Sequence, residues 1–388
     1  MKVGILTYHR SVNHGAFLQA YCLVKSMKKC LGKTAKVEVI DYTSKKAYQL
    51  DLKVVFRGNN IKDIYERFIR WYKFREAAKR LPLSKDKLIS DDIEQVKEFI
   101  NKQAYDIIIV GSDEVWKTTS VRGFPNAYWL NFPICNAIKV TYAVSSRSKL
   151  NQMSKQDREY VQMAIKNFDL LGIRDDTTAN EIYKLTHEKY IMCCDPTFTI
   201  QLKVERDICK KILRKKLNVP RSKKLMGVML AHEEIVEKLR KEFGEEYFIV
   251  SLFEHLNAVN SNYIAISPFE FIRIVAGLDC FITTRFHGAV FAIKENVPFL
   301  AIDDYDCYER SRLRFLLQEN GLDNHLLMYS KHRNFADIVC RKFKECIDDK
   351  RYNQLAYKAV KNEKCKFAHY IEQLEKIMEE KNVSRNWR

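Results

Sequence analysis

The sequence has 388 residues, which exceeds the roughly 250–300 residues at which a single hydrophobic core stops growing, so we expect two domains. Hydrophobic residues make up 46% of the chain, which excludes a disordered protein, and no stretch approaches the roughly 18–20 apolar residues of a membrane span. The formal net charge of +18 makes anions the expected partners: nucleic acid, an anionic membrane surface or phosphorylated small molecules.

The start of the chain and its cysteines indicate a reducing compartment. Met1–Leu6 enters a strand pattern directly and lacks the regions of a secretory signal. The 11 cysteines show no CxxC or Cys/His ligand spacing, and most fall in apolar patterns, where reduced cysteine behaves as a small hydrophobe. We therefore expect a cytoplasmic protein without structural zinc, with peripheral contact at the inner membrane face left open by the charge.

Short apolar runs alternate with longer amphipathic stretches in the first half, which is typical of βαβ units and a parallel sheet. The predicted strands are Val3–Tyr8, Val37–Tyr42, Asp106–Val110, Lys139–Ser145, Leu170–Arg174 and Tyr190–Cys194. The predicted helices are Ala16–Leu31, Ile61–Lys79, Asp91–Asn101, Lys155–Phe168 and Thr177–Thr186.

A second series of the same kind follows a basic, polar segment around Asn218–Lys224. Its predicted strands are Leu225–Ala231, Tyr247–Leu252, Tyr263–Ile266, Cys280–Thr284 and Phe299–Ile302, and its helices are Glu233–Phe243, Pro268–Ala276 and Gly288–Glu295. Residues 334–381 are expected to be helical throughout. The pattern predicts an α/β protein with two Rossmann-like domains, residues 1–200 and 201–388, facing each other across a cleft.

Ligands of open α/β sheets collect at the carboxyl ends of strands, where helix N-termini offer free N–H groups. The first segment at such a place holds Asn13, His14 and Gly15, before the first predicted helix. Gly15 lets the backbone approach a ligand, and Asn13 is either a helix cap or a ligand contact. The segment is not GxGxxG, so a dinucleotide fingerprint is absent.

Two further segments end strands with polar residues. After Val110 come Gly111, Ser112 and Asp113, whose carboxylate can orient a hydroxyl or act as a general base; the alternative is a cap made by Ser112 or Asp113. After Ile173 comes Arg174, whose guanidinium can bind a carboxylate or phosphate bidentately, unless it forms a structural pair with an aspartate.

The fourth segment is the strongest candidate. Arg285 and His287 follow the strand that ends at Thr284, and Gly288 begins a helix. Together with the positive helix end, the two side chains make an anion site, and His287 can transfer a proton near neutral pH. A histidine in a structural role is the alternative.

One segment resembles a metal site. Asp303 to Asp306 contains an Asp-x-Asp pattern of the kind that holds a divalent cation against a sugar-nucleotide diphosphate. The arginines that follow, Arg310 and Arg312, offer these carboxylates ordinary ion pairs. We therefore predict that Asp304 and Asp306 bind no metal.

The ordered set of segments resembles the polysaccharide pyruvyl transferase family. It covers residues 1 to about 325. The segments that carry the resemblance are 13–21, 109–116, 141–145, 173–175, 195–197, 267–271, 284–291 and 311–313. The resemblance implies a GT-B-like fold, no cofactor and no metal, and transfer of pyruvate from phosphoenolpyruvate to two hydroxyls of a sugar, giving a cyclic ketal and phosphate.

The resemblance also implies residue roles. Arg174, Arg285 and His287 would contact the donor, with His287 as general acid or holder of the leaving phosphate. Asp113 would orient or deprotonate a sugar hydroxyl. The further expected substrate contacts are Asn13, His14, Gly15 and Ser112. The expected partners are phosphoenolpyruvate and a glycan or lipid-linked saccharide acceptor, with possible contact to an anionic membrane.

Two other functions fit parts of the pattern. A glycosyltransferase of the same fold would use an acidic residue after the helix at Gly288 to bind a nucleotide ribose, and Glu295 is available. A basic binding protein would hold nucleic acid or a membrane without turnover. Basic runs such as Arg214–Lys216 are also typical of solvated helix faces and linkers, and no nucleic-acid-binding motif accompanies them, so nucleic acid is not expected as a partner.

Overall fold

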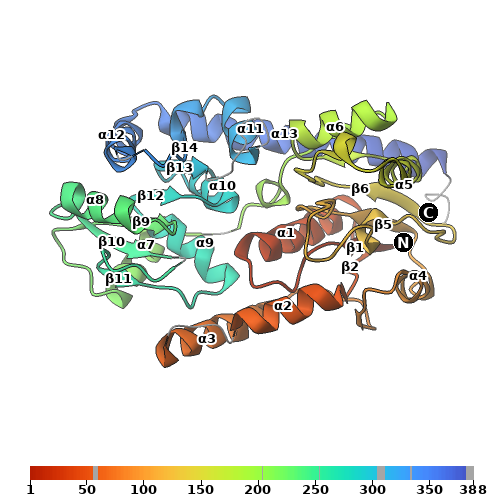
Figure 1. Ribbon diagram of the computed structural model, residues 1–388, viewed down its shortest axis with the longest axis horizontal. Coiled ribbons are helices and arrows are strands. Elements are labelled where there is room, and N and C mark those ends of the chain that lie inside the picture. Colours follow the sequence, from red (N-terminus) through yellow and green to blue (C-terminus); the bar gives the residue numbers. More distant parts are fainter. Residues whose placement is uncertain (56–59, 203, 253, 304–310, 333, 382–388) are drawn as a thin grey trace. The chain divides into compact units, whose positions relative to one another are not determined.

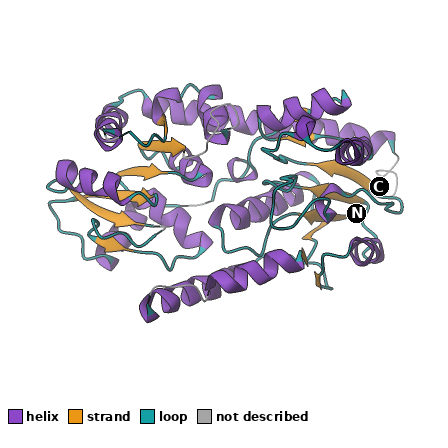
Figure 2. Ribbon diagram, in the orientation of Figure 1, coloured by secondary structure: helices purple, strands orange, loops and turns teal. Residues whose placement is uncertain are grey.

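The computed structural model describes residues 1–55, 60–202, 204–252, 254–303, 311–332 and 334–381. Contacts divide the chain into two compact units. The first comprises Met1–Gly58, Phe74–Ile200 and Glu363–Arg388, and the second comprises Asn59–Lys73 and Gln201–Asn362. Figure 1 shows the chain coloured from its red N-terminus to its blue C-terminus, and Figure 2 shows helices and strands alternating in both units.

The first unit is built on a parallel sheet of four strands in the order β2-β1-β5-β6. Its strands are β1 (Lys2–Leu6), β2 (Lys36–Val39), β5 (Ile107–Val110) and β6 (Ile138–Thr141). Two short parallel pairs add β3 (Tyr42–Thr43) with β4 (Leu88–Ile89), and β7 (Gly172–Ile173) with β8 (Ile191–Met192). Because the central strands are apolar along their whole length, the sheet is buried on both faces.

Helices cover this sheet. They are α1 (His14–Cys30), α2 (Lys45–Val55), α4 (Ile93–Lys102), α5 (Lys155–Lys166) and α6 (Asp176–Thr186), with 3₁₀ turns at Ala127–Trp129, Leu150–Gln152 and Pro196–Phe198. Side chains of α4, α5 and α6 share one core with the sheet, in which the Trp116 and Trp129 rings stack 5.0 Å apart. Side-chain caps begin several of these helices, as Asp92 does for α4 and Ser154 for α5.

The second unit contains a parallel six-stranded sheet in the order β11-β10-β9-β12-β13-β14. The strands are β9 (Lys224–Met229), β10 (Tyr247–Ser251), β11 (Ser261–Asn262), β12 (Cys280–Thr283), β13 (Phe299–Asp303) and β14 (Leu326–Met328). The helices are α3 (Ile61–Ala78, second unit through Lys73), α7 (Arg206–Lys216), α8 (Glu233–Phe243), α9 (Pro268–Gly277), α10 (Phe286–Lys294), α11 (Arg312–Glu319), α12 (Phe335–Asp348) and α13 (Tyr352–Glu380), with a 3₁₀ turn at Asp323–His325. Helices α8 and α12 share one core with the sheet.

Most predicted elements are present, with some differences. The strand predicted at Tyr263–Ile266 is wrong: the strand here is Ser261–Asn262, because only Val250 and Ser251 of β10 have partners at this edge. The structure adds α2, α7, α11 and the short strands β3, β4 and β14. The basic segment at 218–223 is the turn between α7 and β9, inside the second unit.

The units also depart from a simple division at residue 200. Residues of α3 up to Lys73 cluster with the second unit, where Glu66 pairs with His255 at 2.9 Å and Lys73 with Glu270 at 2.9 Å. The end of α13 clusters with the first unit, where the Tyr370 ring packs edge-on against Tyr142 at 4.8 Å. The prediction that residues 201–388 form one domain misses this because such long-range contacts leave no local pattern. In the described part of the chain, no helix has the length and apolar character needed to cross a membrane.

Candidate functional site

The loop after β5 places Ser112 and Asp113 at the carboxyl end of the first sheet. Gly111 begins it with φ of +111°, and a Cβ atom there would collide with the carbonyl oxygen of Tyr142, so only glycine fits. The Gly111–Ser112 peptide is cis. Asp113 has φ of +85°, which is strained for a residue other than glycine, and non-glycine residues held in such conformations cluster at active sites and ligand contacts.

A guanidinium group lies between two carboxylates next to this loop. Arg174 follows β7 and is 4% exposed; its Nη1 donates to Asp195 Oδ2 at 2.9 Å, and its Nη2 is 3.5 Å from Asp113 Oδ1. Asp195 is itself fixed as the cap of the turn at 196–198, accepting from Thr197 N at 3.0 Å. Arg174 therefore has the structural pairing that was the alternative to a ligand contact, and it holds Asp113 in place.

Ser112 is fully buried and held by its backbone. Its N–H donates to Gln19 Oε1 at 3.3 Å, and its carbonyl accepts from Thr7 Oγ1 at 2.9 Å. Its hydroxyl has no hydrogen-bond partner among the residues that the structure describes. A buried hydroxyl without a partner costs about 1–3 kcal/mol, so a bound water molecule is the partner we expect for this oxygen.

The loop before α1 shows that Asn13 caps the helix. Its Oδ1 accepts from Gly15 N at 2.9 Å and Ala16 N at 3.2 Å, so Asn13 caps the helix, while the residue itself is exposed. His14 is 3% exposed, and its ring lies 5.0 Å from that of Phe74. Gly15 is buried as well. Of these three predicted substrate contacts, only Asn13 faces solvent.

The same loop holds a buried charged cluster that was not predicted. The His9 ring lies between two oxygens, with Thr7 O 3.0 Å from Nδ1 and Asp41 Oδ1 3.1 Å from Nε2. Arg10 donates to the same carboxylate, with Nε at 2.6 Å from Oδ1. Burial alone would raise the pKa of Asp41, but hydrogen bonds from His9 and Arg10 outweigh it and hold the pKa well below its usual value.

In the second unit, Arg285 and His287 lie where β12 passes into α10. Arg285 is the exposed N-cap residue, and its N–H donates to Thr283 Oγ1 at 3.0 Å. The partly buried His287 ring contacts that of Phe286 at 5.3 Å. A Cβ atom at Gly288 would collide with Thr283 Oγ1, so glycine lets the first turn of α10 approach the strand. The helix N-terminus adds positive potential to both side chains.

Arg70 of α3 is a cation that sequence reasoning missed. Burial lowers the pKa of Arg70 to about 10; Glu254 opposes this, and the positive charges of Arg67 and Arg285 add to it. Glu254 is therefore the charge that acts most strongly on Arg70, and Arg67 and Arg285 are weaker, repulsive neighbours. The helical periodicity of the sequence predicts that Arg70 lies on a polar face of α3. It cannot predict that Arg285 lies near Arg70, because the two residues are far apart in the sequence.

The residues considered for a metal or a nucleotide lie elsewhere. Asp303 is buried and accepts a hydrogen bond from Ser311 Oγ, the cap of α11, whereas Asp304 and Asp306 lie outside the described residues. Glu295 is at the C-terminal end of α10, opposite Arg285, and burial raises its pKa to about 7. Among the described residues, no group of three His, Cys, Asp or Glu side chains could hold a metal ion.

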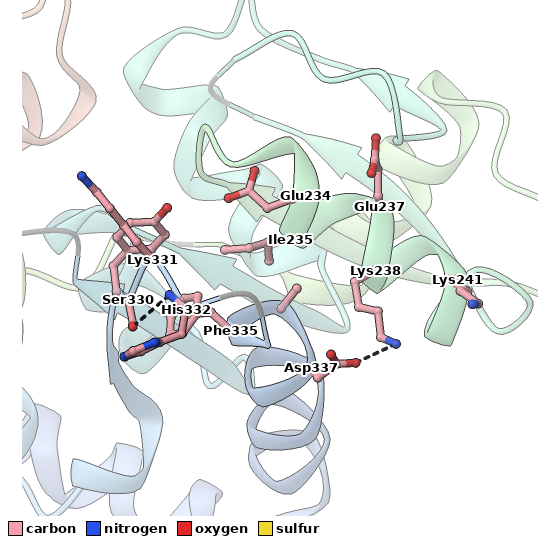
Figure 3. A pocket seen from close by; sticks show the side chains of 12 residues that line it. Glu234, Ile235, Glu237, Lys238, Lys241, Ser330, Lys331, His332, Phe335 and Asp337 are labelled. Atoms are coloured by element: carbon pink, nitrogen blue, oxygen red, sulfur yellow. Dashed lines mark hydrogen bonds and ion pairs between the residues drawn. The ribbon is translucent and has the colours of Figure 1, made fainter.

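A separate hollow of about 500 Å³ lies between α8, α12 and the end of β14. Figure 3 shows its lining, where Lys238 pairs with Asp337 at 2.7 Å. Tyr329 and His332 also contribute to the wall. None of the predicted site residues lines it, and its lysines and acidic residues compensate one another.

Solved structures identify the fold class. The chain is similar to the UDP-GlcNAc 2-epimerase from Neisseria meningitidis bound to UDP-GlcNAc (10% identity, covering 97% of this chain and 100% of that chain, TM-score 0.55). It is also similar to Anabaena HepE in complex with UDP and glucose (13%, 98% and 100%, TM-score 0.54) and to an Arabidopsis thaliana protein complexed with UDP-L-rhamnose (12%, 97% and 98%, TM-score 0.54). The two units with parallel sheets are thus an α/β fold of the GT-B type, as expected.

The family follows from the sequence match. The profile described as polysaccharide pyruvyl transferase matches residues 13–306, a span that includes every predicted site residue. The chain therefore belongs to the polysaccharide pyruvyl transferase family, which makes it a transferase acting on polysaccharides. Among curated proteins, none matches the chain.

Proposed function

We propose that this protein transfers the pyruvyl group of phosphoenolpyruvate to two hydroxyls of a sugar in a polysaccharide or its lipid-linked precursor. The family match over residues 13–306 carries the proposal. It is supported by the cations at the start of α10, because phosphoenolpyruvate presents a carboxylate and a phosphate, and fixed guanidinium groups suit both.

The reaction balances without an oxidant or a cofactor. A proton adds to the methylene carbon of the donor, which becomes a methyl group and leaves positive charge at C2. One sugar hydroxyl adds to C2, the bond from C2 to the phosphate oxygen breaks, and the second hydroxyl closes the ketal. Of the two protons that the hydroxyls lose, one replaces the proton taken up by carbon and the other leaves with phosphate.

The second unit would hold the donor. Arg285 clamps an anionic group bidentately, and the dipole of α10 and the charge of Arg70 strengthen the same anion site. His287, one residue into the helix, serves as general acid or stabilises the leaving phosphate. Binding the donor needs a cation that stays charged, which is the role of Arg285. Proton transfer needs a group that can exchange a proton, which is the role of His287.

The first unit would hold the acceptor. Asp113 orients or deprotonates a sugar hydroxyl, and Arg174, which pairs with both Asp113 and Asp195, orients this carboxylate. We therefore assign Arg174 to positioning Asp113 in place of a donor contact. The Ser112 hydroxyl and the exposed Asn13 amide are the further acceptor contacts.

The decisive experiment measures phosphate released from phosphoenolpyruvate with a panel of glycan and lipid-linked acceptors. We expect release that depends on an acceptor, with pyruvate retained on the product in an acid-labile ketal. Release that never depends on an acceptor would refute the transfer.

Thermal unfolding with ligands provides a second criterion, because a ligand that binds the folded state raises the melting temperature. We expect phosphoenolpyruvate to stabilise the protein. Stabilisation by a UDP- or GDP-sugar but not by phosphoenolpyruvate would identify a glycosyltransferase instead.

A further inference from the structure

Helix α3 (Ile61–Ala78) exposes apolar side chains and buries charged ones along much of its length, which is the reverse of an ordinary surface helix. A helix on a soluble domain normally turns apolar side chains toward the core and charged ones toward water. Over residues 61–73 of α3, charged side chains face the second unit and four large apolar side chains are exposed, whereas Phe74, which follows, is buried.

The inner side of α3 is held by ion pairs. Asp63 is 8% exposed and pairs with Arg67 at 2.9 Å. Glu66 pairs with His255 at 2.9 Å, and Lys73 donates to Glu270 at 2.9 Å and to the Ala265 carbonyl at 2.8 Å. Because Glu66 and Lys73 contact residues outside α3, they fix the rotation of the helix about its axis.

The outer side is a stripe of exposed apolar residues, which we call the aromatic face: Ile61, Tyr65, Phe68 and Tyr72. Their exposed fractions are 87%, 63%, 43% and 51%. The spacing of four, three and four residues puts all of them on one side of a helix. Phe68 stacks on Trp71 at 5.8 Å, which widens the face. A contiguous exposed patch of this kind marks an interaction site.

The charges along α3 select the partner. Residues 61–80 contain seven lysines and arginines against three aspartates and glutamates. The whole chain carries a formal charge of +18, so positive charge predominates in this segment as it does in the protein. A second copy of this chain would bring the same cations against each other across a two-fold axis, whereas anionic lipid headgroups would neutralise them.

We propose that the aromatic face of α3 docks on an anionic lipid surface. Tyrosine, tryptophan and phenylalanine flanked by lysine and arginine are the composition of a helix that lies in the plane of the membrane interface. Tyrosine suits this depth because its ring is apolar and its hydroxyl stays in water. The docking does not depend on pyruvyl transfer, because binding to lipid needs no turnover.

Vesicle flotation of the full-length protein tests the proposal. The probes are vesicles of phosphatidylcholine alone and of an equimolar mixture with phosphatidylglycerol. We expect flotation with the mixed vesicles, weakened by salt, and little with phosphatidylcholine alone. The variant Tyr65→Ser/Phe68→Ser/Tyr72→Ser should lower the partition coefficient by about tenfold or more. The matched control is Tyr357→Ser on α13, a tyrosine that is 75% exposed and should leave flotation unchanged.

The substituted side chains are exposed, so the triple variant should keep the melting temperature of the parent, which thermal unfolding checks. Phosphate release with a soluble acceptor should be unaffected by it, so a failure of docking can be told apart from a failure of the proposed reaction. Equal flotation with both vesicle types, unchanged flotation of the triple variant, or a dimer in light scattering that the triple variant abolishes would each overturn the lipid proposal.

Discussion

Two arginines of the same sequence pattern, each at the end of a strand, differ in what surrounds them. Arg174 is 4% exposed and faces the carboxylates of Asp113 and Asp195, so its charge is already compensated. Arg285 is exposed at a helix N-terminus, and Arg70 adds positive charge near it. We therefore propose that Arg285 binds the donor anion and that Arg174 positions Asp113.

Substitutions at Arg285 and His287 should separate binding from chemistry. Arg285→Lys keeps the charge but loses the planar fork, so donor affinity should fall by about 1.5–3 kcal/mol. His287→Gln should lower kcat by about 10²–10⁴-fold while changing donor KM far less, because general acid–base catalysis acts on the transition state. Steady-state kinetics with varied phosphoenolpyruvate measures both.

Thermal unfolding of both variants is the control, since purely structural roles would lower stability and activity together. A folded His287→Gln protein with near-normal kcat would remove His287 from the catalytic residues.

At the scale of elements, periodicity and caps predicted the sheets well and the packing between distant segments poorly. Strands β1, β5 and β12 are continuous apolar runs that end in glycine or polar residues, and such runs can be found from sequence alone. Two-residue strands such as β3 and β4 carry too few residues for a period. Helix α7 was missed because Lys210 to Lys216 resemble a solvated linker, although Cys209 and Leu213 give the helix a buried side.

In the candidate site, too, single residues could be predicted from the sequence, whereas contacts between distant segments could not. The sequence correctly placed Asp113, Arg285 and His287 after the ends of strands, and their roles in the reaction stay predictions. The pairing of Arg174 with Asp195 joins residues from separate segments, and the cluster of His9 and Asp41 joins two loops; neither has a local signature. His14 was expected to contact substrate from its place before α1, but its ring packs on Phe74, which is far away in sequence.

The start of α1 permits a test of the two roles of Asn13. Its Oδ1 caps the helix, so Asn13→Ala should destabilise the protein by about 1 kcal/mol, whereas Asn13→Asp keeps the accepting oxygen and the melting temperature. Under the proposed function, the amide N–H₂ is the part of Asn13 that would contact an acceptor sugar. Asn13→Asp should therefore raise the acceptor KM while leaving stability unchanged. An unchanged acceptor KM in this variant would leave Asn13 as a cap alone.

At the scale of the whole molecule, charge connects the two proposals. The surplus of +18 includes the cations that would neutralise the donor and those beside the aromatic face of α3. Arg70 points inward from α3, and the aromatic face lies on the other side of the same helix. Under the two proposals, α3 would touch lipid on one side and the donor anion on the other, an arrangement that would suit a lipid-linked acceptor.

The same balance of charge makes a prediction about metals. Glycosyl transfer from a sugar-nucleotide diphosphate often needs a divalent cation to neutralise the leaving group, held by an Asp-x-Asp pattern. Here positive charge is already supplied by Arg285, Arg70 and the N-terminus of α10. The carboxylate of Asp303 accepts a hydrogen bond from the Ser311 hydroxyl. Phosphate release should therefore proceed at an essentially unchanged rate after dialysis against EDTA. Loss of activity with EDTA that Mg²⁺ or Mn²⁺ restores would instead identify Asp304 and Asp306 as metal ligands. In that case the variant Asp306→Asn should also lose activity. Under our proposal, Asp306→Asn keeps its activity.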